Sequence, residues 1–441
     1  MIIVLGGGIA GLAAARTLSG AGEEYLVLER EEEPGGHCRT IDAGSYAFDR
    51  SGHFLHTAEA AMRDWILALP GVSWKETARD ARVFLRGKIT PYPFQVNLRG
   101  HDPAFVSRCL AGFAAARIRA AVRGERDPGD LAGWLLSRFG RAMCSAFFFP
   151  YNRKVWRVPL REMTCEWTGW SVPVPRFEDL LAGARGEERG GLGYNASFLY
   201  PRRGGIGALP RALARPLRGR IRTGTEALAL DLARRVVRTA DGKVLPYRAV
   251  VSTIPLPELA RRSSGLPAGP ARAAAALRWV KVLAVNLGVR RPARAPGHWV
   301  YVPERRYPFF RVGFLSNVAP SAAPDGCAAV FAEKSFPAGA RVDATRETRS
   351  AVAALRRMGI LSPGSRIEEA RPVLLDPAYV VFDRARRRAV PLLLDEFARR
   401  GVFPAGRYGA WDYYGMERSM ADGIRAARDA MRFAGGPGSR A

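Results

Sequence analysis

Residues 1–40 read MIIVLGGGIAGLAAARTLSGAGEEYLVLEREEEPGGHCRT, and this stretch decides the fold. Residues 2–5 and 25–28 are apolar runs typical of strands that are buried on both faces. Between them lies an Ala- and Leu-rich segment of helical character. It is introduced by three glycines in G-x-G-x-x-G spacing, Gly6, Gly8 and Gly11. Glu29 follows the second strand where dinucleotide-binding folds hold ribose hydroxyls, so the whole order predicts a dinucleotide-binding βαβ unit.

Each glycine of this motif has its own physical role. The first allows a tight turn, the second lets the backbone approach a pyrophosphate, and the third lets helix and strand pack closely. The N-terminus of the helix then faces the phosphates. A Gly-rich turn in an unrelated α/β protein is the alternative interpretation, and the flanking strands and acid count against it.

The continuation Pro34-Gly35-Gly36-His37-Cys38-Arg39-Thr40 carries a second glycine motif. It resembles that of the large FAD family of amine oxidases, protoporphyrinogen oxidases and UDP-galactopyranose mutases. The resemblance implies that Gly36 and Arg39 lie beside the flavin phosphates and that Arg30 belongs to the same cofactor site. The two motifs together favour FAD over NAD as the cofactor.

Two later segments extend this resemblance to the flavin ring. Residues 45–56, SYAFDRSGHFLH, are similar to a mutase segment that lies against the flavin, which makes Gly52 and His53 expected flavin contacts. A loop histidine that bonds to backbone is the alternative for His53. Residues 402–409 resemble the last flavin-binding segment of the family, with Gly406 and Arg407 at the cofactor.

The ends of several helices can be predicted from capping residues. Asp102 and Asp130 each precede a helical pattern and are expected to cap it. Ser419 is expected to cap the final helix with Asp422 as its capping-box partner. Gly423 would let that helix approach the FAD.

The substrate region is expected from aromatic rings and side-chain amides in a proline-punctuated segment, a combination suited to holding a ring. Ordinary packing is the alternative. The order of these residues resembles the eukaryotic-type UDP-galactopyranose mutases, with gaps, over most of the chain. The resemblance implies a nucleotide-sugar pocket lined by Tyr92, Gln95, Tyr151, Asn152, Trp156, Asn195, Arg203, Arg311, Tyr379 and Tyr413.

The chain also departs from those mutases. Ser171 stands where they carry an arginine that grips the diphosphate, and Phe310 stands in place of a tyrosine. A serine hydroxyl cannot replace a bidentate, charge-assisted arginine contact. Either another arginine compensates, with Arg203, Arg311 and the run 384–388 as candidates, or the substrate is not UDP-galactose; we expect an altered substrate. The run 384–388 is otherwise expected to be a solvated loop.

Composition is that of a globular protein. The chain has 441 residues, of which 48% are hydrophobic and 25% charged, enough for a large core in two or three domains. Its apolar runs are shorter than the roughly 18 residues of a membrane helix, and the N-terminus lacks the basic region of a signal peptide. Five scattered cysteines without a C-x-x-C pair predict a cytoplasmic protein with neither a disulfide framework nor a metal site.

The formal net charge of +27 raises the question of a nucleic-acid partner. Only six of the 68 basic residues are lysine, so arginine supplies the other 62, and alanine, glycine and proline are also abundant. That pattern is typical of a compositional bias. Because no nucleic-acid-binding motif accompanies it, we expect no specific nucleic-acid binding, and at most a loose association with an anionic surface or acidic partner.

The expected fold class is α/β. A discontinuous Rossmann-like FAD-binding domain is built from residues 1–57, 192–260 and 395–434. Residues 58–191 form a mostly helical insert, residues 261–394 a β-rich substrate domain, and residues 435–441 a disordered tail.

The resemblance implies a flavin-dependent mutase that interconverts the pyranose and furanose forms of a nucleotide-linked sugar. Reduced FAD is the active form, its N5 is the nucleophile at the anomeric carbon, and NAD(P)H is a candidate reductant. A cofactor nucleophile fits a chain without a Ser-His-Asp or Cys-His set. The alternatives are an FAD oxidase or desaturase of the amine oxidase type and, outside enzymes, a flavoprotein scaffold that docks to anionic partners.

Overall fold

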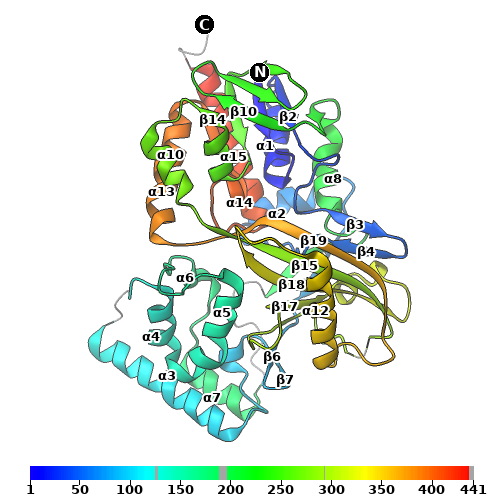
Figure 1. Cartoon of the computed structure of the whole chain (residues 1–441), viewed down its shortest axis with the longest axis vertical. Coiled ribbons are helices and arrows are strands. Elements are labelled where there is room, and N and C mark those ends of the chain that lie inside the picture. Colours follow the sequence, from blue (N-terminus) through cyan, green and yellow to red (C-terminus); the bar gives the residue numbers. More distant parts are fainter. Residues whose placement is uncertain (125–127, 188–195, 293, 437–441) are drawn as a thin grey trace.

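The computed structural model describes residues 1–124, 128–187, 196–292 and 294–436, and Asn195 and residues 437–441 of the predictions lie outside that part. Within it, a five-stranded parallel sheet of order β20-β13-β1-β2-β9 forms the upper part of the molecule (Figure 1). Its strands are β1 (Ile2–Leu5), β2 (Tyr25–Leu28), β9 (Ile221–Arg222), β13 (Ala249–Ser252) and β20 (Val402–Pro404). The apolar runs of β1, β2 and β13 are buried along their whole length, as the sequence predicts for central parallel strands.

Helices α1 (Ile9–Gly20) and α15 (Met416–Gly435) pack against each other and against this sheet. The prediction that Ser419 caps α15 is wrong, because the helix begins one turn earlier, after Gly415. Met416 is thereby buried, and Asp422 accepts a hydrogen bond from the Gly406 amide at 2.8 Å instead of returning to a cap. The predicted caps Asp102 and Asp130 are confirmed, since each accepts a backbone amide of its helix.

Smaller elements complete this upper part. A four-stranded sheet in the described residues has the order β12-β11-β10-β14, and a two-stranded sheet pairs β3 with β4. The strands are β3 (Thr40–Ala43), β4 (Tyr46–Asp49), β10 (Ala227–Asp231), β11 (Val236–Thr239), β12 (Val244–Pro246) and β14 (Ser263–Ser264). The helices are α2 (Ala60–Leu67), α8 (Ala208–Ala214), α9 (Leu256–Arg262), α10 (Ala268–Ala275), α13 (Arg384–Arg399) and α14 (Gly406–Gly409).

The run 384–388 is not the solvated loop expected from the sequence. Asp383 accepts the Arg386 amide at 2.8 Å and caps α13, so the run forms the first turn of that helix. Arg386 is buried, with its guanidinium over the Phe382 ring and a hydrogen bond to the Trp411 carbonyl. A basic run at a helix N-terminus is tolerated here because carbonyl and carboxylate groups surround it.

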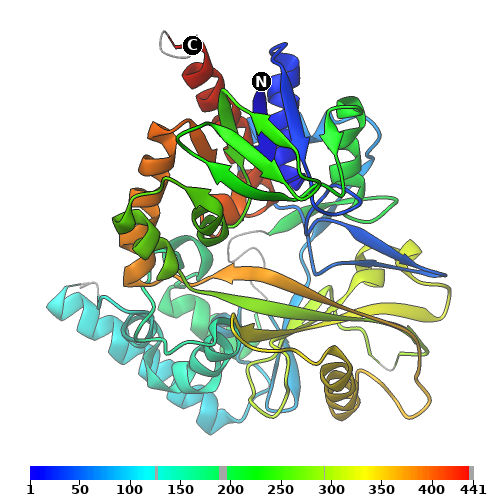
Figure 2. The same ribbon diagram turned by 45° about the horizontal axis from the view of Figure 1, so that its top comes forward.

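A mixed sheet lies below the parallel sheet (Figure 2). In the described residues it has seven strands in the order β19-β15-β18-β17-β16-β6-β7. They are β6 (Ala81–Leu85), β7 (Lys88–Pro91), β15 (Trp279–Arg290), β16 (Trp299–Tyr301), β17 (Arg311–Phe314), β18 (Cys327–Pro337) and β19 (Arg366–Val380). Helix α12 (Ala344–Arg357) packs against β15 and β19, and α11 (Leu315–Val318) follows β17.

A group of helices occupies the lower left of Figure 1. It comprises α3 (Pro103–Arg123), α4 (Leu131–Met143), a π-helical turn (Cys144–Phe148), α5 (Phe149–Trp156), α6 (Thr168–Ser171) and α7 (Phe177–Arg185). No helix in the described residues is long and apolar enough to cross a membrane.

The predicted α/β class with a Rossmann-like sheet is confirmed. The segment 58–191 is less purely helical than its expected label, since β6 and β7 join the mixed sheet and β5 (Trp74–Ala78) pairs with β8 (Ser197–Pro201). In these parts of the segment, short strands form instead of helices.

The contact between α1 and α15 yields the first prediction. A Cβ at Gly423 would lie 2.1 Å from the Ala10 carbonyl oxygen, whereas a Cβ at Gly435, in the same helix, would meet nothing within 4 Å. We expect Gly423→Ala to lower the free energy of unfolding by about 1–3 kcal/mol, the usual cost of overpacking. Gly435→Ala should be neutral in the same urea titration, and equal stability of the two variants would contradict this account of the contact.

Candidate active site

A cavity of about 1290 Å³ runs between the parallel and mixed sheets. It extends from Gly6 and Gly8 at the start of α1 to Tyr379 and Tyr413 at the mixed sheet. Pockets for one small ligand typically measure about 300–1,000 Å³, so this one has room for a dinucleotide and a second molecule.

The glycines at its upper end form an open cradle. Gly6 has φ +96°, and a Cβ there would lie 2.2 Å from the Thr253 hydroxyl. A Cβ at Gly11 would lie 2.0 Å from the Gly6 carbonyl oxygen, which explains the close packing of helix on strand. At Gly8 a Cβ would meet nothing within 4 Å. Gly8 therefore faces open space before the N-terminus of α1, where a pyrophosphate would bind.

Glu29 lies beside this cradle as predicted. Its carboxylate accepts the Gly7 amide at 2.7 Å and the Glu31 amide at 2.9 Å. Burial raises the pKa of Glu29, and the Gly7 hydrogen bond opposes that effect. Glu29 and the exposed Arg30 both line the cavity, so they are placed to reach ribose hydroxyls.

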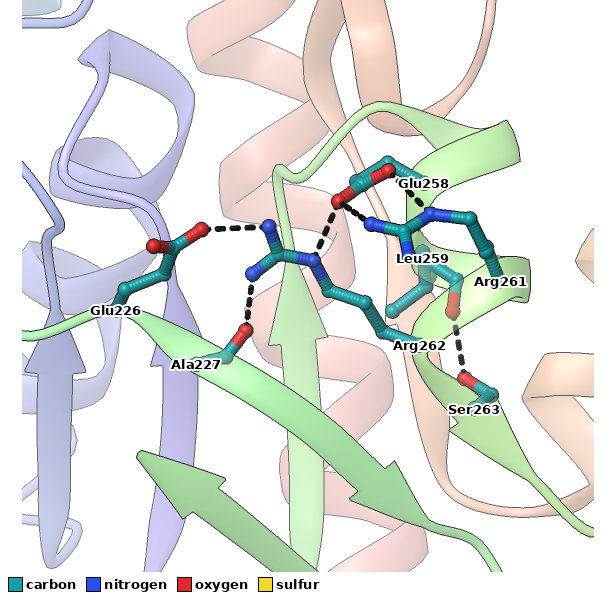
Figure 3. A network of polar contacts seen from close by, with 7 residues as sticks. All are labelled: Glu226, Ala227, Glu258, Leu259, Arg261, Arg262 and Ser263. Atoms are coloured by element: carbon teal, nitrogen blue, oxygen red, sulfur yellow. Dashed lines mark hydrogen bonds and ion pairs between the residues drawn. The ribbon is translucent and has the colours of Figure 1, made fainter. Parts of the chain in front are cut away.

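Charged side chains border the same end of the cavity. Figure 3 shows the polar contacts between them. Arg262 lies between two carboxylates, with ion pairs of 2.5 Å to Glu226 and 2.6 Å to Glu258, and it also bonds to the Ala227 carbonyl. Arg261 pairs with Glu258 at 2.6 Å. The network ties α9 to β10 and thereby closes the rim of the dinucleotide end.

The second glycine motif docks directly on the first. The Gly35 amide donates to the Gly7 carbonyl at 2.8 Å, and Gly36, with φ +56°, would place a Cβ 3.3 Å from the Gly8 Cα. Gly36 lines the cavity. Arg39 pairs with Glu31 and donates to the Glu33 carbonyl at 3.2 Å, and its side chain is not part of the cavity wall.

Two histidines lie at the middle of the cavity. Burial lowers the pKa of His37 to about 3 and that of His53 to about 4, so both imidazoles are neutral. His37 Nε2 lies 3.2 Å from the Pro377 carbonyl, which fixes its proton on that nitrogen. The Nδ1 atoms of both rings are buried and have no partner in the described residues. Nδ1 of neutral His37 can therefore only accept a hydrogen bond from a bound molecule, whereas Nδ1 of His53 could accept or donate one.

The C-terminal segment reaches the same place. Arg407 lines the cavity, with its guanidinium 5.2 Å from the Tyr379 ring and 4.6 Å from the Tyr413 ring. Gly406 has φ +75°, and a Cβ there would lie 2.6 Å from the Ala10 side chain. Gly423 does not line the cavity: it lets α15 approach α1 rather than the cofactor.

A buried ion pair lies where the mixed sheet meets the cavity. Arg311 binds Glu333 through two hydrogen bonds of 2.5 and 2.8 Å, and the Ser51 hydroxyl donates to the same carboxylate. Burial raises the pKa of Glu333, but the charge of Arg311 outweighs it and leaves that pKa below its usual value. Gly52 packs here without a side chain, since a Cβ would lie 2.6 Å from the Phe331 ring.

The wall around Arg311 is aromatic and hydroxylated. Tyr379 and Tyr413 stack with ring centres 5.7 Å apart, and Tyr301 and Arg79 also line the cavity. Tyr92 and Tyr151 lie just behind, 5.2 and 5.6 Å from the Tyr301 ring. Phe310, which has no hydroxyl group, is buried. Tyr301 pairs across the strands with the next residue, Arg311, and supplies a phenol hydroxyl in this region.

The remaining substrate candidates are not brought into the wall. The Gln95 amide donates to the Pro173 carbonyl at 2.7 Å. Asn152 accepts the Trp156 indole proton at 3.0 Å, and Trp156 is buried behind Tyr379 and Tyr413. Arg203 is exposed on a loop outside the cavity.

Several cavity residues were not predicted from the sequence, among them His37, Arg79 and Tyr301. His37 stands inside the second glycine motif and could have been found there. Arg79 has its guanidinium 4.9 Å above the Tyr92 ring. Tyr301 is the cross-strand partner of Arg311, a pairing that only the register of the sheet reveals.

Comparison with known proteins agrees with this geometry. A family model of flavin containing amine oxidoreductases matches residues 9–346. Among curated proteins, the chain is 46% identical over 48 residues to a phytoene dehydrogenase of Streptomyces griseus, which covers 11% of this chain and 10% of that protein. It is 27% identical over 155 residues to a phytoene desaturase of Cereibacter sphaeroides, which covers 34% of this chain and 26% of that protein. The chain thus spans a small part of the length of the curated relatives it matches.

Solved structures are similar over the whole chain. A reduced UDP-galactopyranose mutase has a TM-score of 0.90 at 25% identity and covers 99% of this chain and 96% of its own. A putative protoporphyrinogen oxidase from Exiguobacterium sp. 255-15 has a TM-score of 0.73 at 18% identity, with 97% of each chain covered.

The cradle at Gly8 gives a test of the cofactor site. Gly8 has ordinary extended backbone angles and no protein atom near its missing Cβ, so Gly8→Val should fold normally. The new side chain would occupy the space of the phosphates, and we expect at least about tenfold weaker flavin binding. Gly20→Ala, at the far end of α1, is the control. Full flavin content in purified Gly8→Val would contradict the assignment.

The pKa of His37 gives a test by pH. Its folded value of about 3 lies below the ordinary 6.5, so between these values only the unfolded chain binds the proton. Stability from this group is present above pH 6.5 and falls as the pH drops. We expect urea titrations to give His37→Gln a pH slope shallower than wild type by up to about 1.4 kcal/mol per pH unit between pH 6 and 4. Identical slopes would show that His37 stays protonatable in the folded protein.

Proposed function

The chain belongs to the family of flavin containing amine oxidoreductases, and on that basis we propose that it is an FAD-dependent mutase of a nucleotide-linked sugar. The observation that carries this proposal is the polar wall of the cavity beyond the two histidines. It presents Arg79, Arg311 and tyrosine hydroxyls, groups suited to a diphosphate and a sugar. The whole-chain similarity to a reduced UDP-galactopyranose mutase supports it.

The residues present fit FAD. Gly8 and the N-terminus of α1 would hold the pyrophosphate, Glu29 the adenosine ribose, and His37, His53 and Arg407 the flavin end. When bound and reduced, the cofactor supplies the nucleophile for the anomeric carbon, so the protein itself need not provide one. We propose NAD(P)H as a candidate reductant.

The chain's own residues then bind and orient the substrate. Arg311 is held by Glu333 through Nε and Nη2, and its Nη1 carries no hydrogen bond to the described residues. Arg79 also lines the cavity, with its guanidinium 4.9 Å from the centre of the Tyr92 ring. Together they would grip the diphosphate from two sides and keep it close while the sugar changes ring size. Neutral His37 and His53 add no competing charge beside the cofactor.

Position 171 bears on which sugar is used. With serine there, one diphosphate contact of the eukaryotic-type mutases is missing, and we propose a nucleotide-linked sugar other than UDP-galactose. Arg79 and Arg311 are the arginines best placed to compensate, because Arg203 lies outside the cavity and Arg386 is engaged in α13.

A second candidate function is an FAD oxidase or desaturase. The short similarities to a phytoene dehydrogenase and a phytoene desaturase favour it. A long hydrocarbon would offer no hydrogen-bond partner to the tyrosine hydroxyls or to the remaining donor of Arg311 in the cavity wall, which weighs against a carotenoid substrate.

We also propose a cytoplasmic location. The five cysteines support it, because all of them are free thiols. The formal net charge of +27 supports our proposal of loose contact with anionic surfaces, and we propose no specific nucleic-acid partner.

The test offers nucleotide-linked pyranoses and furanoses, UDP-galactose among them, to dithionite-reduced enzyme without oxygen, with products followed by chromatography. We expect interconversion that consumes no reductant stoichiometrically.

Arg79→Met should lower kcat/KM by about 30-fold or more, as expected for a lost charged contact of about 2 kcal/mol. Arg108→Met, on the exposed face of α3, is the control and should be unchanged.

Stoichiometric consumption of oxygen or another acceptor would instead indicate the oxidase. Efficient conversion of UDP-galactose would contradict the altered substrate and point to compensation by Arg79 and Arg311.

A further inference from the structure

A partly buried lysine joins the helical region to the mixed sheet. Lys154, on α5, donates to the carbonyl oxygens of Val302 at 2.7 Å, Glu304 at 2.9 Å and Phe309 at 2.6 Å. An ammonium group has three protons, so all of its donors are used. Burial lowers the pKa of Lys154 to about 7, and the negative charge of Glu304 opposes that effect.

The use of lysine here is itself informative. Only six of the 68 basic residues of this chain are lysine. A tetrahedral ammonium can direct its protons to three convergent carbonyls, whereas the planar fork of arginine directs its donors to one side or edge. In a chain that otherwise favours arginine, the contact geometry at position 154 is one that arginine cannot reproduce.

The three carbonyls belong to one loop. Residues 302–310 connect β16 to β17, and the strands on either side end in Tyr301 and begin with Arg311. These two residues are paired across the strands, and both line the cavity. The loop is closed at its base by the Val302 amide, which donates to the Phe310 carbonyl at 2.8 Å. Holding the loop therefore holds Tyr301 and Arg311.

The same helix face touches the pocket wall directly. Tyr151 precedes Lys154 by one helical turn and packs edge-on against Tyr301, with ring centres 5.6 Å apart, and against Phe310 at 6.4 Å. Lys154 and Tyr151 thus contact both the loop and the residues that it carries. The contact sets how far α5 lies from the substrate end of the cavity.

We propose that Lys154 is a positioning residue that fixes the substrate end of the cavity by clamping the loop 302–310 against α5. This proposal rests on the proposed function only because it takes the ligand to be a nucleotide. Lys154 does not itself line the cavity, so it acts through Tyr301 and Arg311.

The test compares flavin-loaded wild type, Lys154→Met and Lys154→Arg, with Lys243→Met as control. Lys243 lies on an exposed hairpin and pairs with Asp241, far in the fold from α5. The first measurement is hydrogen–deuterium exchange of the segment 302–310. The second is the dissociation constant for UDP, followed by the change in flavin absorbance.

We expect Lys154→Met to exchange about tenfold faster in 302–310 and to bind UDP about tenfold more weakly, with flavin content unchanged. In Lys154→Arg, neither the exchange of residues 302–310 nor the affinity for UDP should return fully to the wild-type value. Should Lys154→Met fail to fold, Lys154→Arg carries the same two measurements.

A folded Lys154→Met with wild-type exchange and a UDP dissociation constant within about twofold of wild type would overturn the proposal. So would full recovery in Lys154→Arg. If wild type binds no nucleotide, the proposed function fails, and the exchange of 302–310 alone still decides whether Lys154 is the clamp.

Discussion

Two close backbone-to-backbone approaches meet at the first turn of α1, and a third glycine packs there against the side chain of Ala10. The carbonyl of Gly6 occupies the space of a Cβ at Gly11, the carbonyl of Ala10 occupies that of a Cβ at Gly423, and Gly406 packs against Ala10. Because close-packed backbone cannot yield to an added methyl group, these approaches fix α1 against β1 and α15 within tenths of an ångström. The rest of the site depends on this, since α1 presents its N-terminus to the cavity and the C-terminal segment brings Arg407 to the same place.

The cavity divides into two electrostatic environments. At the dinucleotide end, backbone amides and the carboxylate of Glu29 offer hydrogen bonds. At the other end, a buried Arg311–Glu333 pair and a group of tyrosines form the wall. Removing only one member of a buried pair leaves an uncompensated charge, which makes Arg311 a fixed part of the architecture as well as the cation that we propose for the ligand. The neutral histidines separate the two environments.

The sequence was most informative where function depends on local pattern. Gly6, Gly8, Gly11 and Glu29 sit in one βαβ unit, so their spacing alone predicted their places. Arg79 and Tyr301 could not be found this way, because a loop and a strand register bring them to the cavity. Trp156 and Asn152 were expected in the pocket but satisfy each other within α5. Ser419 has the chemistry of a cap, yet burial of Met416 extends α15 past it.

The central claim is that one end of this cavity, from Glu29 to His37 and His53, holds a dinucleotide flavin, with the adenosine at Glu29 and the ring beside the two histidines. Native mass spectrometry of the purified protein, followed by identification of the released cofactor, tests it most directly. We expect one FAD per chain. A chain loaded with FMN, or one that cannot be loaded with any flavin, would contradict it, because the cradle at Gly8 and the carboxylate of Glu29 would then have no ligand.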